Sequence, residues 1–135
     1  MTTLYIETSA LLKRYVLEPE SDECQQILDK YPHWITSRLT VTETLINLRK
    51  RLSTAEFGIA SKLFQSDLNL FDVVEFDVDL SLQAAEVAQG NHLATLDSIH
   101  LASALRIRST RLAFITYDIQ LAKAARKNSL RVLGV

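Results

Sequence analysis

Four acidic residues stand where a carboxylate could do chemistry: Glu7, Glu43, Asp97 and Asp118. Glu7 directly follows the apolar run at residues 4–6, and Asp118 follows the apolar run in AFITYD. If both runs are parallel strands, their carboxyl ends meet at one edge of a sheet, where ligands of such sheets bind. Each acid could instead stabilise a helix N-terminus, by up to about 1 kcal/mol. The recurrence at two strand ends favours a site.

Asp97 and Glu43 lie in helical patterns that turn them toward the protein interior. Asp97 lies in LDSIHLASAL, where Leu101 continues its side of the helix, and Glu43 lies in TVTETLINL between Leu39 and Ile46. A carboxylate on an apolar face is costly unless it is paired or bound to a cation. The ordinary alternatives are capping for Asp97 and a solvated helix face for Glu43.

Converging carboxylates repel one another and raise one another's pKa, and a divalent cation offsets that repulsion. An all-oxygen donor set favours Mg²⁺ or Mn²⁺. Zinc is disfavoured, because Cys24 is the only cysteine and the three histidines show no ligand spacing. We therefore expect Glu7, Asp97 and Asp118 to hold the metal, with Glu43 acting beside it or on a bound water.

Polar neighbours of these acids could support them. The hydroxyls of Thr8, Ser9 and Thr116 could orient waters or carboxylates. Thr8 and Ser9 also open a predicted helix, whose free N–H groups suit phosphate oxygens, although ordinary capping explains them equally well. His100, three residues after Asp97, could orient a carboxylate or contact substrate, or simply pack within its helix.

The elements that must position these residues alternate along the chain. Short apolar runs predict five strands, at residues 4–6, 34–36, 73–76, 112–116 and 131–133. Between them, helical periodicity predicts seven helices, at residues 9–17, 21–31, 40–52, 55–70, 80–89, 97–108 and 119–128. Thr54 is the expected N-cap of the fourth helix, Thr95 can cap the sixth, and Gly90-Asn91 breaks the fifth. Alternation of this kind predicts an α/β fold with a central, mostly parallel sheet flanked by helices.

Composition sets the class of protein. A chain of 135 residues with 47% hydrophobic and 23% charged residues predicts one soluble globular domain over residues 1–135. A single cysteine suits a reducing cytoplasm. The Met-Thr-Thr start has no basic region before an apolar core, and no apolar run is long enough to span a membrane. We therefore expect a cytoplasmic protein with no membrane partner.

Four ordered segments together resemble the PIN-domain ribonucleases, in particular the VapC toxins of bacterial toxin–antitoxin pairs. These segments are YIETSALLKRY, TVTETLINL, LDSIHLASAL and FITYDIQLAKAA. The resemblance implies a PIN-like domain and a metal-dependent endoribonuclease whose catalytic residues are Glu7, Glu43, Asp97, Thr116 and Asp118. The metal would activate water and polarise the scissile phosphate for in-line hydrolysis.

The resemblance also implies partners. VapC-like proteins pair with a small VapB-like antitoxin whose C-terminal segment covers the active site, so a homodimer or a toxin–antitoxin hetero-oligomer is expected. RNA must be held despite a net charge of −1. Lys13, Arg14 and Arg38, near the predicted strand ends, are the candidate phosphate contacts, and solvated surface cations are the alternative.

One residue departs from the family pattern: Glu7 stands where the family nearly always has Asp. Its carboxylate lies about 1.5 Å further along if the backbone is unchanged. The alternative function is therefore a weakened or inactive PIN module that binds RNA or antitoxin. A phospho-receiver domain also gathers acids around Mg²⁺, but its paired acids after the first strand and its lysine after the last are not matched here.

Overall fold

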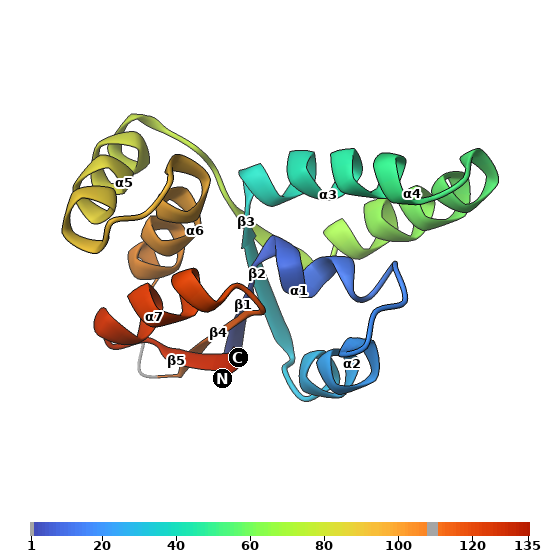
Figure 1. The fold of residues 1–135 in the computed structure, drawn as a ribbon, viewed down its shortest axis with the longest axis horizontal. Coiled ribbons are helices and arrows are strands. Elements are labelled where there is room, and N and C mark those ends of the chain that lie inside the picture. Colours follow the sequence, from blue (N-terminus) through green and yellow to red (C-terminus); the bar gives the residue numbers. More distant parts are fainter. Residues whose placement is uncertain (1, 108–110) are drawn as a thin grey trace.

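The computed structural model describes residues 2–107 and 111–135, and its centre is a five-stranded sheet (Figure 1). The strands are β1 (Thr3–Ile6), β2 (His33–Ser37), β3 (Phe71–Val74), β4 (Leu112–Thr116) and β5 (Arg131–Gly134). They lie in the order β3-β2-β1-β4-β5, and all four neighbouring pairs are parallel. The predicted α/β fold with a parallel sheet is confirmed. Receiver domains have the order 2-1-3-4-5, so this topology also excludes that alternative.

Helices cover both faces of the sheet (Figure 1). They are α1 (Thr8–Leu12), α2 (Ser21–Asp29), α3 (Arg38–Arg51), α4 (Thr54–Leu68), α5 (Val78–Asn91), α6 (Thr95–Arg106) and α7 (Ile119–Lys127). Helices α1 to α4 lie on one side, and α5, α6 and α7 lie on the other. Within the described residues, no helix combines the length and the apolar character needed to cross a membrane.

Strand β1 is buried on both faces and divides the core into two layers. Leu4 and Ile6 pack with residues of α1, α2 and α4, whereas Tyr5 packs with residues of α6 and α7. Both layers exclude water from β1, which explains why its sequence is apolar without alternation. Glu7, which directly follows β1, is therefore buried as well.

Several predicted element ends were wrong, for local reasons. The helix predicted at residues 9–17 ends at Leu12, because the amides of Lys13, Arg14 and Tyr15 bond three residues back in tighter turns. The strand predicted at residues 73–76 spans Phe71–Val74, since pairing with β2 sets its limits. The strand predicted at residues 112–116 is confirmed as it stands, and the ends of the other predicted elements differ from the structure by at most two residues.

Two helix starts were also predicted at the wrong residue. Ser53, not Thr54, caps α4, because Ser53 and Glu56 have the three-residue spacing of a capping box. Likewise Ala94, not Thr95, precedes the first turn of α6, with no side-chain cap, and Asp97 falls in that turn as predicted. The end of the sixth predicted helix, residue 108, lies outside the described residues.

The end of α5 depends on one backbone conformation. The helix runs through Gly90 and ends at Asn91, where His92 adopts the left-handed conformation with φ 54°. The break predicted at Gly90-Asn91 was therefore placed too early. A left-handed residue after a helix satisfies its last carbonyls, and His is tolerated there less readily than Gly but more readily than branched residues.

Candidate active site

The candidate site lies where β1, β2 and β4 end at the same edge of the sheet. Ile6 pairs with Ile115, so Glu7 and Thr116, the next residue of each strand's path, lie side by side. Glu7 is the N-cap of α1, and Asp118 is the N-cap of α7. The helices that carry Glu43 and Asp97 begin beside this edge (Figure 1). The tertiary fold thus gathers side chains that are far apart in the sequence.

Glu7 is buried and held by three hydrogen bonds to one carboxylate oxygen. Its Oε2 accepts from the Ser9 amide at 3.1 Å, from Thr116 Oγ1 at 2.8 Å and from Ser9 Oγ. The Ser9 hydroxyl also accepts the Tyr117 amide at 2.9 Å, which ties the end of β4 to the start of α1. The Ser9 amide, which the sequence suggested as a phosphate contact, donates its hydrogen bond to Glu7 in this structure.

Glu43 is half-buried and is held by two different donors. Its Oε1 lies 2.6 Å from Thr8 Oγ1 and 2.8 Å from His100 Nε2. Burial by itself raises the pKa of Glu43, but the hydrogen bonds from His100 and Thr8 outweigh burial and hold this pKa below its ordinary value. Glu43 is therefore ionised, and its carboxylate is held in one orientation. The Thr8 hydroxyl donates to this carboxylate, as the sequence suggested it could.

The pKa of Asp97 is the clearest sign that negative charge is concentrated at this edge of the sheet. Its pKa is raised, first by burial and then by the charges of Asp118, Glu7 and Glu43, with His100 opposing them. This is the signature expected of several carboxylates that share a poorly solvated region. The charges of the other three predicted acids therefore all reach Asp97 at this edge of the sheet.

Asp118 is half-exposed and has one oxygen engaged by its own helix. Its Oδ1 accepts the Leu121 amide at 3.0 Å, the ordinary N-cap bond. Its own amide donates to Thr116 Oγ1 at 3.0 Å. Thr116 is thus shared between Glu7 and the loop that carries Asp118. The capping interpretation of Asp118 is confirmed, and it is compatible with a role in the site because capping engages one oxygen only.

No ready-made metal cage exists among the residues that the structure describes: nowhere do three acidic, histidine or cysteine side chains converge closely enough to enclose an ion. The chemistry of the donor set nevertheless fits a hard divalent cation, because the acids supply only oxygen atoms. The raised pKa of Asp97 shows that their repulsion is not neutralised by the protein. That Glu7, Asp97 and Asp118 hold Mg²⁺ or Mn²⁺ stays a prediction.

The three predicted RNA-contacting cations each have an acidic partner. Lys13 pairs with Glu18 and Glu20, and Arg14 binds the buried Asp67 through two nitrogens, at 2.8 and 3.2 Å.

Arg38 forms an exposed pair with Glu75, at 2.6 Å. Exposed pairs of this kind contribute at most about 1 kcal/mol, so a phosphate can compete for Arg38 more easily than for Arg14. The RNA contacts stay predictions.

One neighbour of the site was not predicted: Tyr5, in the middle of β1. Its hydroxyl lies 2.9 Å from His100 Nδ1, and its ring stacks on Phe114 at 5.1 Å. A tyrosine in an otherwise aliphatic strand was the available signal, since a buried phenol needs a polar partner. The sequence offered no way to identify that partner, which is 95 residues away.

Comparison with known proteins identifies the family to which this fold and its acidic edge belong. The PIN domain family model matches residues 4–127. Over 136 residues the chain is 35% identical to Ribonuclease VapC35 of Mycobacterium tuberculosis, with 97% of this chain and 96% of that protein covered. The chain belongs to the PIN domain family, and within it resembles the VapC proteins.

Solved structures agree on the fold. FitAcB from Neisseria gonorrhoeae superposes with a TM-score of 0.76 at 21% identity, covering 96% of each chain. A toxin–antitoxin complex from Klebsiella pneumoniae gives a TM-score of 0.67 at 21% identity, covering 85% of this chain and 86% of that one. At these identities the match concerns the fold, which is the PIN fold.

Proposed function

We propose that this protein is a metal-dependent endoribonuclease, the toxin of a toxin–antitoxin pair, that hydrolyses RNA phosphodiester bonds in the cytoplasm. The observation that carries the proposal is the effect of the charges of Asp118, Glu7 and Glu43 on the pKa of Asp97 at the carboxyl edge of the parallel sheet. The similarity to Ribonuclease VapC35 supports the choice of RNA over other phosphodiesters.

The chain's own residues divide the work. Glu7, Asp97 and Asp118 would hold Mg²⁺ or Mn²⁺, which when bound supplies charge that polarises a phosphate and lowers the pKa of water. Thr116 and Ser9 keep the Glu7 carboxylate in place.

Glu43, which is ionised and accepts hydrogen bonds from Thr8 and His100, would accept a proton from the attacking water.

The test is cleavage of single-stranded RNA by the purified chain in EDTA and in added Mg²⁺, Mn²⁺ or Ca²⁺. We expect cleavage with Mg²⁺ or Mn²⁺ and none in EDTA. Ca²⁺ should support little cleavage, because its longer and looser coordination misplaces the reacting groups. Cleavage that is equally fast in EDTA would contradict the metal requirement.

A second candidate rests on Glu7. If the longer side chain misplaces its carboxylate, the protein is a PIN module that binds RNA or antitoxin without cutting. Retained RNA binding with no cleavage in any metal would favour this candidate over the nuclease. The distinction is made in the same assay, with RNA binding measured in parallel by fluorescence anisotropy.

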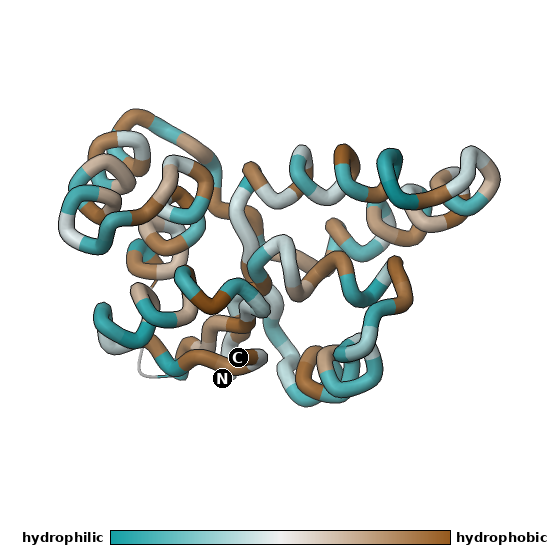
Figure 2. Tube along the Cα trace, in the orientation of Figure 1, coloured by the Kyte–Doolittle hydropathy of each residue, from teal (hydrophilic) through white to brown (hydrophobic). Residues whose placement is uncertain are grey.

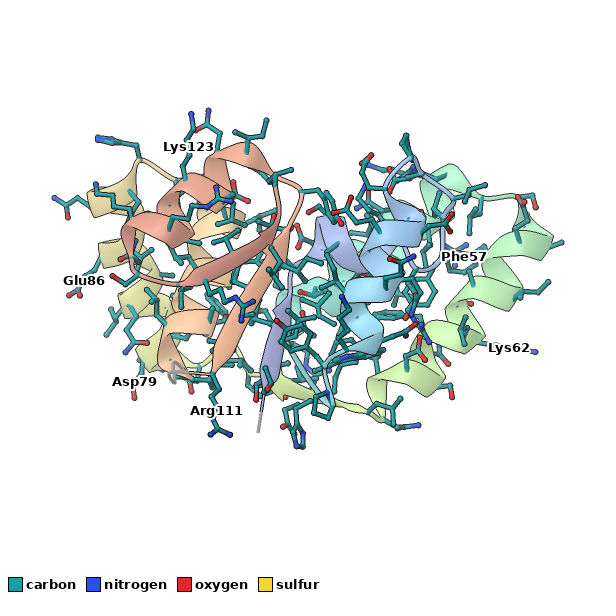
Figure 3. The ribbon with its side chains drawn as sticks, turned by 90° about the horizontal axis from the view of Figure 1, so that it is seen from below. Phe57, Lys62, Asp79, Glu86, Arg111 and Lys123 are labelled. Atoms are coloured by element: carbon teal, nitrogen blue, oxygen red, sulfur yellow. The ribbon has the colours of Figure 1, made fainter. Side chains whose placement is uncertain are left out.

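The antitoxin would bind a groove between α3 and α4. Hydrophobic and hydrophilic residues alternate along these two helices, which project from the sheet (Figure 2). Phe57 lies on the inner side of α4, while Lys62 points away (Figure 3). The groove has a volume of about 470 Å³ and is lined by Leu45, Ile46, Arg49, Lys50, Phe57, Ser61 and Gln65.

One residue that lines the groove, Ile46, lies three residues after Glu43 on α3. Glu43, Ile46 and Lys50 share one face of α3, and three residues of helix span about 4.5 Å. An apolar segment in the groove could therefore place its end over the carboxylates. The arginine or lysine that the family resemblance suggests for that end would complement their charge. The toxin–antitoxin complex from Klebsiella pneumoniae, with the same fold, supports a partner of this kind.

Replacing Ile46, which is 49% exposed, with Asp should weaken antitoxin binding at least about tenfold, since a charge would enter the apolar groove. The antitoxin is identified as the protein whose co-production restores growth, and binding is measured by co-purification and titration. Leu82→Asp is the matched control, because Leu82 is 63% exposed on α5, away from the groove. Equal loss in both variants would argue against the groove.

A further inference from the structure

A buried chain of hydrogen bonds lies behind the acidic edge. Tyr5 and His100 are 0% and 1% exposed. The Tyr5 hydroxyl lies 2.9 Å from His100 Nδ1, and His100 Nε2 lies 2.8 Å from Glu43 Oε1 and 3.3 Å from Thr8 Oγ1. Both ring nitrogens of this histidine therefore have partners, one in the core and one in the site.

The two end groups of this series of hydrogen bonds, Tyr5 and Glu43, determine where its protons lie. The Tyr5 phenol carries its proton at neutral pH, because the ordinary pKa of a tyrosine is about 10. A neutral imidazole has one donor and one acceptor nitrogen. If Tyr5 donates to Nδ1, Nε2 carries the proton and donates to the Glu43 carboxylate, which can only accept.

The position of His100 also matters for charge. Its Nε2 lies 3.9 Å from Glu7 Oε1, so this nitrogen stands between two of the four acids. An N–H there attracts both carboxylates at a point where they would otherwise repel each other. Without it, only the Thr8 hydroxyl would hold the long Glu43 side chain beside the other acids.

We propose that His100 is a positioning residue for the nuclease reaction: Tyr5 fixes its Nε2–H tautomer, and that N–H holds Glu43 in its working orientation. This inference rests on the proposed nuclease function, and it assigns Tyr5 a role that no sequence motif suggests. Second-layer partners of this kind typically change activity 10- to 100-fold, through orientation and not through contact with the substrate.

Two amide variants separate orientation from packing. The amide nitrogen of Gln extends about as far as Nε2, whereas that of Asn stops near Nδ1. We expect His100→Asn to lower kcat about 10- to 100-fold with KM for RNA changed by less than about threefold, and His100→Gln to recover most of the activity. His92→Asn is the control, since His92 is an exposed left-handed helix cap that Asn fits well.

A spectroscopic readout tests the tautomer without relying on cleavage. Nitrogen-15 NMR of the His100 ring should show a protonated Nε2 and an unprotonated, hydrogen-bonded Nδ1. In Tyr5→Phe this preference should weaken and kcat should fall, with Glu43 and His100 both present. These spectra can be recorded even if the parent protein cuts no RNA, so failure of the nuclease function and failure of this assignment are distinguishable.

Either of two results would overturn the inference. One is a parent spectrum in which both ring nitrogens, or Nδ1 alone, carry the proton. The other is a parent that cleaves RNA while His100→Asn and His100→Gln keep the same kcat as each other. The expected pattern is an active His100→Gln, a slow His100→Asn and a mixture of tautomers in Tyr5→Phe. A histidine that only fills space would not produce it.

Discussion

Asp97→Asn should remove nearly all RNA cleavage while making the folded protein more stable at neutral pH. The substitution keeps the shape of the side chain and removes its charge. Loss of a carboxylate that would hold the metal costs several kcal/mol of transition-state stabilisation, which is at least about 100-fold in rate. The gain in stability follows from the raised pKa of Asp97, because burial and the charges of Asp118, Glu7 and Glu43 disfavour its ionised form.

The gain in stability should depend on pH in a defined direction. The pKa of Asp97 in the folded protein is raised above its unfolded value of about 3.9. Below that value the side chain is neutral in both states, so parent and variant should differ little from this cause. As pH rises through the folded pKa, the parent alone acquires an unfavourable charge. The difference in Tm between the Asp97→Asn variant and the parent protein should therefore appear above about pH 4 and persist at pH 7.

Cleavage rates and thermal unfolding curves between about pH 3 and 8, without added divalent metal in the unfolding experiments, check both halves of this prediction. Asp72→Asn is the matched control, because Asp72 is exposed on β3. It should change neither rate nor the pH profile. A variant at position 97 that cuts as fast as the parent would remove Asp97 from the site. If the Asp97→Asn variant is less stable than the parent at every pH, the charge of Asp97 is already compensated within the folded parent protein.

Glu7→Gln should also lower cleavage at least about 100-fold, whereas Glu7→Asp should stay within about tenfold of the parent. The amide side chain keeps an oxygen for the hydrogen bonds from Ser9 and Thr116 but loses the charge. The shorter acid keeps the charge, remains a favoured N-cap for α1, and draws the carboxylate back by about 1.5 Å. The parallel measurement is Mn²⁺ affinity, which should fall in Glu7→Gln and change little in Glu7→Asp.

The comparison also decides between the two candidate functions. If the parent is inactive and Glu7→Asp creates activity, the protein is the non-cleaving module and Glu7 is the reason. Glu86→Gln controls for the loss of one negative charge, since Glu86 is exposed on α5 and points away from the domain (Figure 3). Full activity in the Glu7→Gln variant would show that Glu7 serves only as the cap of α1.

Much of this architecture could be predicted from local sequence. The apolar runs around Leu4 and Phe114 identify strands buried on both faces, because parallel strands covered by helices need no polar alternation. The order of strands and helices then gives the α/β class, and the acids at strand ends give the edge where a site lies. Element ends were less reliable, since Ser37 and Ser53 start their helices through side-chain hydrogen bonds, and each stands next to a threonine that is also a candidate cap.

The sequence by itself determined the chemistry available here, namely four carboxylates, their hydroxyl neighbours and the strands and helices that carry them. Only the tertiary structure decided which donor bonds to which carboxylate oxygen. Thr116 donates to Glu7 across 109 residues of sequence, and His100 bonds to Glu43 across 57 residues. Secondary structure depends on neighbours within a few residues, so its pattern can be read along the chain. Hydrogen bonds between segments depend on how the helices pack against the sheet, and no local pattern of residues records that packing.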